Sequence, residues 1–328
     1  MRAVVMRGPG GPEVLEVREV PTPEPGPGAV RVRVRAAGVN RADLLQRRGR
    51  YPAPGDAPQD VLGLEYAGVV DEVGAGATRF RPGDRVMGIV GGGAYAEAVV
   101  VPESHAIPIP DGLSFEEAAA IPEAFITAHD ALFTLLGLQA GERLLVHAVG
   151  SGVGVAALQL AREAGVTVFG TARSPWKLDR ARELGLDHGI RTEGEGFADE
   201  ILERTGGAGV NAILDLVGGA YLVDNLRALA PKGRMAVVGL VSGSRAELDM
   251  GLLLRKRLTL IGTALRGRNA EEKAEATRAF ADHALPLFAA GRIRPVVDAV
   301  YPMDQAAEAH RRMESNLNFG KLVLSWDV

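Results

Sequence analysis

The chain has 328 residues, of which 47% are hydrophobic and 24% are charged. This is the balance of a folded globular protein, and the length exceeds that of one ordinary compact core, so we expect two domains. The net charge is −4, with Lys and Arg interspersed among Asp and Glu, which argues against nucleic-acid binding. The sequence contains no cysteine, which excludes disulfide bonds and thiolate zinc sites.

The N-terminal residues 1–6 run directly into a strand pattern, and no apolar targeting segment is visible there. The longest apolar runs have the length of strands, well below the roughly 20 residues that a membrane-spanning helix needs. We therefore expect a cytoplasmic protein that does not associate with membranes.

The first 120 residues are predicted to be rich in β-strands. Residues 31–36 alternate apolar and charged side chains, which is typical of a half-buried strand. A helix over residues 41–48 is expected to follow Asn40, and a second helix is expected after Ser114, which can form a capping box with Glu117. Turn-rich segments separate the other short strands, expected at residues 68–73, 85–90 and 96–101.

From residue 123 to residue 265 the pattern changes to alternating strands and helices, which predicts a parallel, doubly wound Rossmann sheet. Strands are expected at residues 144–147, 166–170, 210–214 and 235–238, with helices at 152–164, 176–184 and 221–229. After residue 266 come a long helix (270–290), a strand (296–301), a short helix and a last strand (321–324). We expect these to return to the first domain. The predicted fold is therefore α/β, with a discontinuous β-rich domain (1–122 and 266–328) and a Rossmann domain (123–265).

A glycine-rich segment joins the first Rossmann strand to the helix that follows it. Its residues are Gly150, Ser151, Gly152, Val153 and Gly154, with the spacing G-x-G-x-G rather than G-x-G-x-x-G. A dinucleotide pyrophosphate binds to backbone N–H groups at a helix N-terminus, where side chains would obstruct it. A tight turn in any α/β protein is the alternative. The strand before, the helix after and a second strand about 20 residues on favour a dinucleotide site.

The end of the second strand predicts which dinucleotide binds. NAD enzymes usually place an acidic residue there, whereas NADP enzymes place cations. This chain has Arg173, Ser174 and Lys177, and no acidic residue before Asp179. The cations could instead merely be solvated at the start of a helix. Because the helix dipole disfavours cations at that end, we favour a site for the 2′-phosphate of NADPH.

Several segments together resemble the medium-chain dehydrogenase/reductase superfamily, over nearly the whole chain. Within it the chain is most similar to the zinc-independent quinone oxidoreductases related to zeta-crystallin, especially the tumour-suppressor-inducible branch. The resemblance implies that the β-rich domain is GroES-like and catalytic. It is carried, besides the glycine-rich loop, by residues 37–43, 63–65, 82–86, 118–122 and 318–321.

The positions of the superfamily's catalytic zinc ligands predict that this protein binds no metal. Zinc-dependent alcohol dehydrogenases have a cysteine where this chain has Asn40 and a histidine where it has Leu64. The six histidines of this chain show no metal-binding spacing, and the structural four-cysteine lobe is missing. Without a Lewis acid, alcohol oxidation is disfavoured, and quinones or activated alkenes are the expected hydride acceptors.

The resemblance also implies site residues. Positions matching Asn40, Asp43, Tyr51 and Thr127 lie near the nicotinamide or line the quinone pocket in this family. The alternatives are that Asn40 and Asp43 cap the helix they begin, that Thr127 is a helix-interior residue and that Tyr51 anchors a loop. Relatives often have a tyrosine for the 2′-phosphate at the position where this chain has Thr192. The remaining cofactor-flanking positions are Gly239, Leu240, Leu265, Asn318 and Lys321.

Three functions remain open at this point. The first is an NADPH:quinone oxidoreductase, the second an NADPH-dependent enoyl or alkenal reductase, and the third a low-turnover NADPH-binding structural protein. Residues 258–261 are also expected to form an apolar strand at the edge of the Rossmann sheet. Exposed edges favour pairing with a second copy, and the resemblance implies a homodimer through this strand.

Overall fold

The computed structural model describes residues 1–193 and 196–327, and the chain forms two compact units. The first unit combines Met1–Ile126 with Leu265–Val328, and the second is Thr127–Ala264. The segment from Leu265 onward therefore belongs to the same unit as the N-terminal segment. Within the described ranges, no helix has both the length and the apolar character needed to cross a bilayer.

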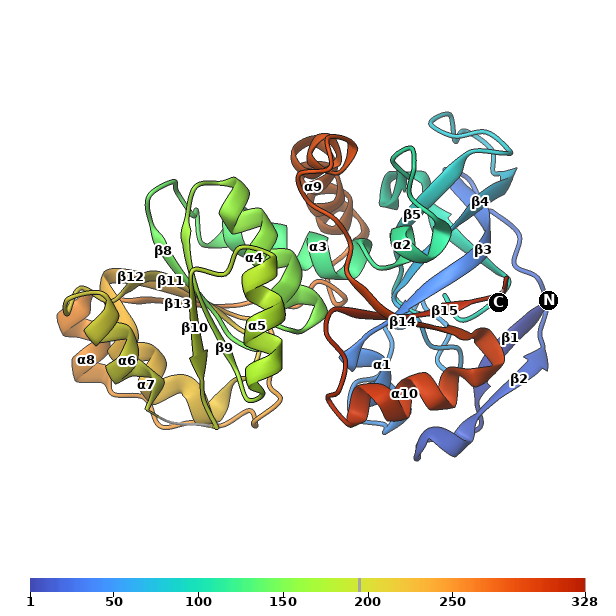
Figure 1. Ribbon diagram of the computed structural model, residues 1–328. Coiled ribbons are helices and arrows are strands. Elements are labelled where there is room, and N and C mark those ends of the chain that lie inside the picture. Colours follow the sequence, from blue (N-terminus) through green and yellow to red (C-terminus); the bar gives the residue numbers. More distant parts are fainter. Residues whose placement is uncertain (194–195, 328) are drawn as a thin grey trace. The chain divides into compact units, whose positions relative to one another are not determined.

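The second unit is built on a parallel sheet, as expected for a Rossmann fold (Figure 1). Its strand order is β10-β9-β8-β11-β12-β13, which is the doubly wound order with its switch point between β8 and β11. The strand β10 was not expected from the sequence, and β13 lies at the sheet edge as expected. The bounds are β8 (Arg143–Val146), β9 (Thr167–Ala172), β10 (His188–Arg191), β11 (Val210–Asp215), β12 (Leu229–Val237) and β13 (Thr259–Gly262).

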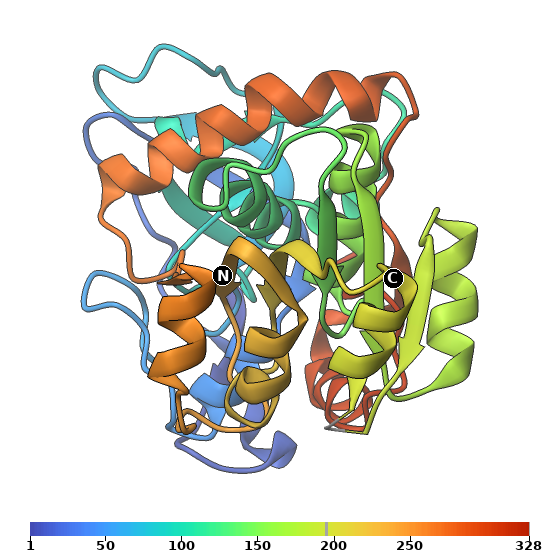
Figure 2. The ribbon, with the colours of Figure 1, turned by 90° about the vertical axis from the view of Figure 1, so that its left-hand side faces the viewer.

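Helices cover both faces of this sheet (Figures 1 and 2). α4 (Gly152–Glu163) and α5 (Pro175–Glu183) pack on one face. α6 (Phe197–Arg204), α7 (Leu222–Ala228) and α8 (Met250–Lys256) lie on the other. The core between the layers contains Leu145, Phe169 and Ile213, which are at most 1% exposed.

The first unit contains a mostly antiparallel sheet in the order β14-β15-β3-β4-β5-β7, and β6 also pairs with β3. The C-terminal strand β15 runs antiparallel to β3, with Leu322 opposite Val39. This register places the residue that begins β15 beside the residue that follows β3. The bounds are β3 (Ala29–Val39), β4 (Glu65–Val73), β5 (Arg85–Ile89), β6 (Ala98–Pro102), β7 (Ala106–Pro108), β14 (Val297–Pro302) and β15 (Lys321–Ser325); β1 (Arg2–Met6) and β2 (Leu15–Glu19) pair separately.

The helices of the first unit begin where the sequence predicts them. Ser114 caps α2, since its hydroxyl accepts from Glu117 N at 3.1 Å while Glu117 Oε2 accepts from Ser114 N at 2.9 Å. α10 contacts α1, and the two helices lie side by side below the sheet in Figure 1. The bounds are α1 (Arg41–Arg47), α2 (Phe115–Ala119), α9 (Ala270–Ala289) and α10 (Ala306–Glu314), and α3 (Pro122–His129) contains the boundary between the units.

Candidate active site in the first unit and candidate cofactor site in the second

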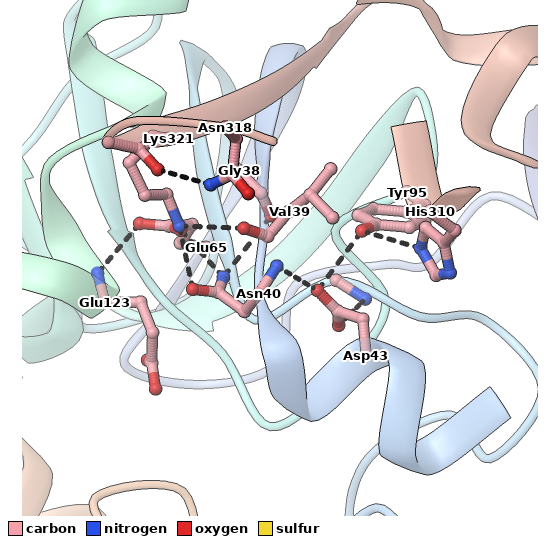
Figure 3. Close-up of polar contacts among 12 residues, drawn as sticks. Gly38, Val39, Asn40, Asp43, Glu65, Tyr95, Glu123, His310, Asn318 and Lys321 are labelled. Carbon is pink, nitrogen blue, oxygen red and sulfur yellow. Dashed lines mark hydrogen bonds and ion pairs between the residues drawn. The ribbon is translucent and has the colours of Figure 1, made fainter. Parts of the chain in front are cut away.

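The candidate active site forms where β3 ends and α1 begins. Asn40 stands at the N-terminus of α1, and its side chain points away from the helix toward β4 and β15 (Figure 3). Asn40 Nδ2 donates to Glu65 Oε1 at 2.8 Å, and Asn40 Oδ1 accepts from Lys321 Nζ at 2.7 Å. The second contact of Nδ2, to Gly38 O, is long at 3.4 Å. The amide plane of Asn40 is thus fixed by two charged groups.

Glu65 and Lys321 form a buried ion pair behind Asn40. Glu65 is fully buried and Lys321 is 4% exposed, and Lys321 Nζ lies 2.5 Å from Glu65 Oε1. Lys321 Nζ also donates to Val39 O at 3.0 Å, so each of its three N–H bonds has an acceptor. A Cβ on Gly38 would lie 2.2 Å from Glu65 Oε1, which explains why glycine occupies that position. Both charged groups of this buried pair therefore have hydrogen-bond partners, which a buried ion pair requires.

A second buried carboxylate, Asp43, fixes the first turn of α1. Its Oδ2 accepts from Asn40 N at 2.8 Å and from the Tyr95 hydroxyl at 3.1 Å, and its Oδ1 accepts from Gly63 N at 3.1 Å. Burial raises the pKa of Asp43 to about 6, although the hydrogen bonds from Asn40 and Gly63 oppose the shift. The capping role that the sequence allows for Asp43 is therefore present in the structure.

The Tyr95 hydroxyl continues into a chain of buried polar groups (Figure 3). His310 Nε2 lies 3.3 Å from this hydroxyl, and His310 Nδ1 lies 3.1 Å from Arg47 Nη1. Because a guanidinium can only donate, Nδ1 accepts and the Nε2–H faces Tyr95. Burial, together with the charge of Arg47, lowers the pKa of His310 to about 3. The chain ends at Glu314, which is paired with Arg47.

Tyr51 and Glu123 are partly exposed beside these buried charges. The guanidinium carbon of Arg266, which is 5% exposed, lies 5.2 Å from the Tyr51 ring centroid, within cation–π range. Arg266 is anchored by Gln46 Oε1 at 2.5 Å and Gly91 O at 2.8 Å. Within the described ranges the Tyr51 hydroxyl makes no hydrogen bond. It is therefore able to donate to a ligand.

The four catalytic positions expected from the resemblance are divided between the two units. The structure brings Asn40 and Asp43 together at the start of α1 and places Tyr51 in the same unit. Thr127 is the first residue of the second unit, in α3, and is 9% exposed. Glu65, Glu123 and Arg266 are further members of the site that were not predicted from the sequence. For Glu65 a signal existed, because it directly follows the zinc-ligand position of Leu64.

In the second unit, the glycine-rich loop leads into α4 as expected. Ser151 is the N-cap residue, and its Oγ accepts from Gly154 N at 3.1 Å. The first-turn N–H groups of Gly152 and Val153 have no acceptor within the helix. A Cβ on Gly154 would lie 2.5 Å from Ala148 O, so glycine lets the helix approach the strand closely. This loop fits the pyrophosphate of a dinucleotide, which binds to such N–H groups.

The residues expected at the 2′-phosphate gather at the carboxyl ends of β9 and β10. Arg173 is exposed, Ser174 is the N-cap residue of α5, and Lys177 Nζ lies 5.4 Å from the Trp176 ring centroid. Thr192 N donates to Ala172 O at 3.1 Å, which ties the two strand ends together. The Thr192 hydroxyl is hydrogen-bonded to Tyr221. The carboxyl ends of β9 and β10 thus combine two cations with the partly exposed Ser174 and the buried Thr192.

Gly239 and Leu240 follow the carboxyl end of β12, which lies at the same end of the parallel sheet as the carboxyl ends of β9 and β10. A Cβ on Gly239 would lie 2.6 Å from Leu216 O, and Leu240 is 55% exposed. The other expected cofactor-flanking residues belong to the first unit. Leu265 is 7% exposed, Asn318 Nδ2 donates to Gly320 O at 3.0 Å, and Lys321 is engaged with Glu65.

A buried network that the sequence analysis did not anticipate lies under the glycine-rich loop. His147 Nε2 is 2.6 Å from Asn225 Oδ1, and Asn225 Nδ2 donates to Asp215 Oδ2 at 3.1 Å. Asp215 Oδ1 accepts from Val217 N at 2.8 Å and Gly218 N at 2.9 Å. The network therefore connects the carboxyl ends of β8 and β11, at the switch point where dinucleotides bind in such sheets.

The side chains that could hold a metal are dispersed. Across residues 1–193 and 196–327, no three or more His, Asp or Glu side chains are grouped so that they could hold a metal ion. Asn40 and Leu64 occupy the positions that carry zinc ligands in related alcohol dehydrogenases, and Leu64 is 1% exposed.

Two family models match successive parts of the chain. Residues 26–111 match the family model described as alcohol dehydrogenase GroES-like domain. Residues 152–282 match the model described as zinc-binding dehydrogenase. The first match covers most of the antiparallel sheet, and the second covers most of the parallel sheet.

Similar proteins cover the chain from end to end. A quinone oxidoreductase of Pseudomonas aeruginosa is 38% identical over 316 residues, which is 96% of each chain. A solved NAD-dependent alcohol dehydrogenase is 40% identical, with a TM-score of 0.89 over 99% of each chain. The Escherichia coli quinone oxidoreductase complexed with NADPH is 29% identical, with a TM-score of 0.89 over 99% of this chain and 100% of that one. The CurK enoyl reductase is 27% identical, with a TM-score of 0.88 over 99% and 98%.

These matches extend over both units and include the glycine-rich loop, so they identify the chain as a whole rather than one domain. The chain belongs to the quinone oxidoreductase family of the medium-chain dehydrogenase/reductase superfamily and is an oxidoreductase that uses a nicotinamide cofactor.

Proposed function

We propose that this protein is an NADPH-dependent quinone oxidoreductase that transfers hydride to a quinone without a metal. The observation that carries the proposal is the hydrogen bonding of the Asn40 side chain. At a zinc-ligand position of related dehydrogenases, its amide is held by Glu65 and Lys321 instead. A quinone accepts hydride without a Lewis acid, since conjugation spreads the incoming charge, whereas an alcohol needs help to lose its proton.

The choice of NADPH rests on the end of β9. When bound, the reduced nicotinamide supplies the hydride. Arg173 and Lys177 offer positive charge to a 2′-phosphate, and Ser174 offers a hydroxyl. An NAD enzyme would be expected to have a carboxylate at this point, and the chain has none before Asp179.

Asn40 and Tyr51 are the groups proposed to meet the quinone oxygens. The Tyr51 hydroxyl makes no hydrogen bond within the described part of the chain, and the Asn40 N–H toward Gly38 O is held only by a 3.4 Å contact. Both can donate to an oxygen that gains negative charge. Asp43, Glu65 and Lys321 hold Asn40 in place, so catalysis would depend on orientation and on prearranged donors.

The second candidate is an enoyl or alkenal reductase, favoured by the full-length likeness to the CurK enoyl reductase. The two candidates differ only in the acceptor. Initial rates of NADPH oxidation should therefore be compared for a panel of benzoquinones, naphthoquinones, alkenals and enoyl thioesters. The proposal requires that a quinone has the highest kcat/KM of the panel. A panel in which only alkenals or enoyl thioesters react would assign the second function.

A further inference from the structure

We propose that Glu123 is the acid that protonates the reduced substrate. This inference rests on the proposed function, because it concerns the proton that must accompany the hydride. The family resemblance did not single out Glu123, and the mechanism above names no source for this proton. The position of Glu123 between a buried carboxylate and the partly exposed edge of the site is what points to this role.

The backbone of Glu123 is fixed at the site. Its N–H donates to Glu65 Oε2 at 2.8 Å, so Glu65 holds Asn40 with one oxygen and Glu123 with the other. Pro122 begins α3 and Glu123 follows it in the first turn. Figure 3 shows that the side chain of Glu123 extends away from Glu65, on the side of the cluster opposite Lys321. The side chain is partly exposed, so it can exchange protons with water.

The charges around Glu123 favour its protonated form. Burial raises the pKa of this carboxyl to about 8, and the carboxylates of Glu65 and Asp43 add to the shift. The positive charges of Lys321 and Arg266 lower the pKa of Glu123. However, Lys321 is paired with Glu65, and Arg266 donates hydrogen bonds to Gln46 and Gly91. Near neutral pH Glu123 is thus a carboxylic acid that can give up a proton.

Burial raises the pKa of the Tyr51 phenol, and the charge of a Glu123 carboxylate adds to the shift, while Arg266 opposes it. When Glu123 is protonated, it places no negative charge near Tyr51. The Tyr51 hydroxyl therefore remains a good hydrogen-bond donor. The two groups have distinct tasks: Tyr51 donates a hydrogen bond to an oxygen, and Glu123 transfers a proton to it.

Addition of hydride to a quinone brings two electrons and one hydrogen and leaves one substrate oxygen negatively charged. The O–H bond of the Glu123 carboxyl breaks, and an O–H bond forms on that oxygen, which completes the quinol. The Glu123 carboxylate then takes a proton from water. The oxidised cofactor is the only other product.

The first test uses the protein without cofactor. Selective ¹³C labelling of glutamate carboxyls and NMR should show one resonance that titrates near pH 8. This resonance should be absent in Glu123→Gln and retained in Glu275→Gln, which removes an exposed acid on α9. Because glutamine resembles the protonated acid in shape and charge, the Glu123→Gln protein should fold, and its thermal unfolding confirms this. The absence of any glutamate titrating between about pH 7 and 9 would overturn the inference.

The second test is the pH profile of quinone reduction. In the wild type, kcat/KM for the quinone should fall above about pH 8, as Glu123 loses its proton. Glu123→Gln should lower turnover at pH 7 by about a hundredfold, abolish this fall and leave NADPH affinity unchanged. Glu123→Asp should restore part of the rate with a shifted profile. Wild-type quinone reduction with an identical profile in Glu123→Gln would refute the acid and leave the function intact. Failure of the wild type with every quinone would refute the function instead.

Discussion

Lys321 Nζ lies 2.5 Å from Glu65 Oε1, and the two residues are 256 positions apart in the sequence. The strand β15 therefore contributes a charged side chain to a site whose other members, apart from Arg266, come from the first 123 residues. Because both groups are buried, each depends on the other for its charge to be tolerated.

Replacing Lys321 with methionine should destabilise the first unit strongly. The change leaves the Glu65 carboxylate buried with only the N–H groups of Asn40 and Glu123, and breaking one side of a buried pair typically costs about 3–5 kcal/mol. The check is the free energy of unfolding from denaturant titration. The double variant Glu65→Gln with Lys321→Met should recover part of the loss, since no unpaired charge remains. A single variant as stable as the wild type would show that the pair does not hold the site together.

The pH dependence of the free energy of unfolding should reveal the lowered pKa of His310. The pKa of His310 is lowered from 6.5 to about 3 in the folded state, so stability is lost as the pH falls below about 6.5 and the unfolded chain gains a proton. The pKa of Asp43 is raised from 3.8 to about 6, so its contribution has the opposite sign and is lost as the pH rises from about 4 to 6. In the wild type, these two contributions oppose each other between about pH 4 and 6.

Two variants separate the contributions. From pH 6 to pH 4, His310→Gln should gain stability relative to the wild type by about 1 kcal/mol per pH unit. Asp43→Asn should lose stability relative to the wild type over the same interval. Unfolding midpoints measured across this interval provide the check. Parallel curves for wild type and His310→Gln would mean that His310 has an ordinary pKa in the folded protein.

Cofactor preference should depend on Lys177. Losing a charge-assisted contact to a phosphate costs about 1.5–3 kcal/mol, so Lys177→Ala should weaken NADPH binding by roughly ten- to a hundredfold. NADH lacks the 2′-phosphate, and its affinity should stay nearly constant. Binding titrations with both cofactors measure this, with Arg255→Ala on α8 as the control for an exposed cation. Equal losses for NADPH and NADH would assign Lys177 a structural role.

The edge strand β13 is predicted to pair with a second copy of the chain. Leu260 and Ile261 are half-buried on a strand that has a neighbour on only one side of the sheet. Sedimentation of the wild type should give a dimer, and Leu260→Lys should shift it toward monomer. Val17→Lys, at an exposed apolar position of β2, is the control and should remain dimeric. A wild type that is monomeric at every concentration would contradict this prediction.

Local patterns were sufficient to predict most elements of the fold. The capping box at Ser114 and Glu117 fixes the start of α2, and the glycines at 150–154 mark the turn into α4. β10 was missed because its four residues include Gly189 and lack a clear alternation. α6 was missed because it follows Gly196 without a side-chain cap. β10 therefore has a weak local signal, whereas α6 lacks only the cap at its start and buries Phe197, Ala198 and Ile201 on one face.

The site was predictable only in part, for a different reason. Asn40 and Asp43 lie in one motif, and their capping geometry follows from their spacing of three residues. The ion pair of Glu65 with Lys321 depends on the register of β15 against β3, which no local pattern records. The environment of Glu123 likewise results from side chains contributed by distant segments.

Removal of the proposed oxygen-facing donors should slow the reaction. Tyr51→Phe and Asn40→Ala should each lower quinone turnover, by ~10²-fold if the donor stabilises developing charge and by less if it only positions the substrate. NADPH affinity should remain nearly intact in both variants. Steady-state kinetics with a binding titration separates the two effects. Unchanged turnover in both variants would place the substrate oxygens elsewhere.

The most direct measurement of the central claim is a single turnover in the absence of oxygen. The protein is mixed with a limiting amount of NADPH and an excess of a quinone, and both NADPH loss and quinol formation are quantified. Hydride transfer from NADPH predicts one quinol for each NADPH consumed, at a rate far above that without protein. NADPH that remains stable with every quinone, but is consumed with an alkenal or an enoyl thioester, would contradict the account.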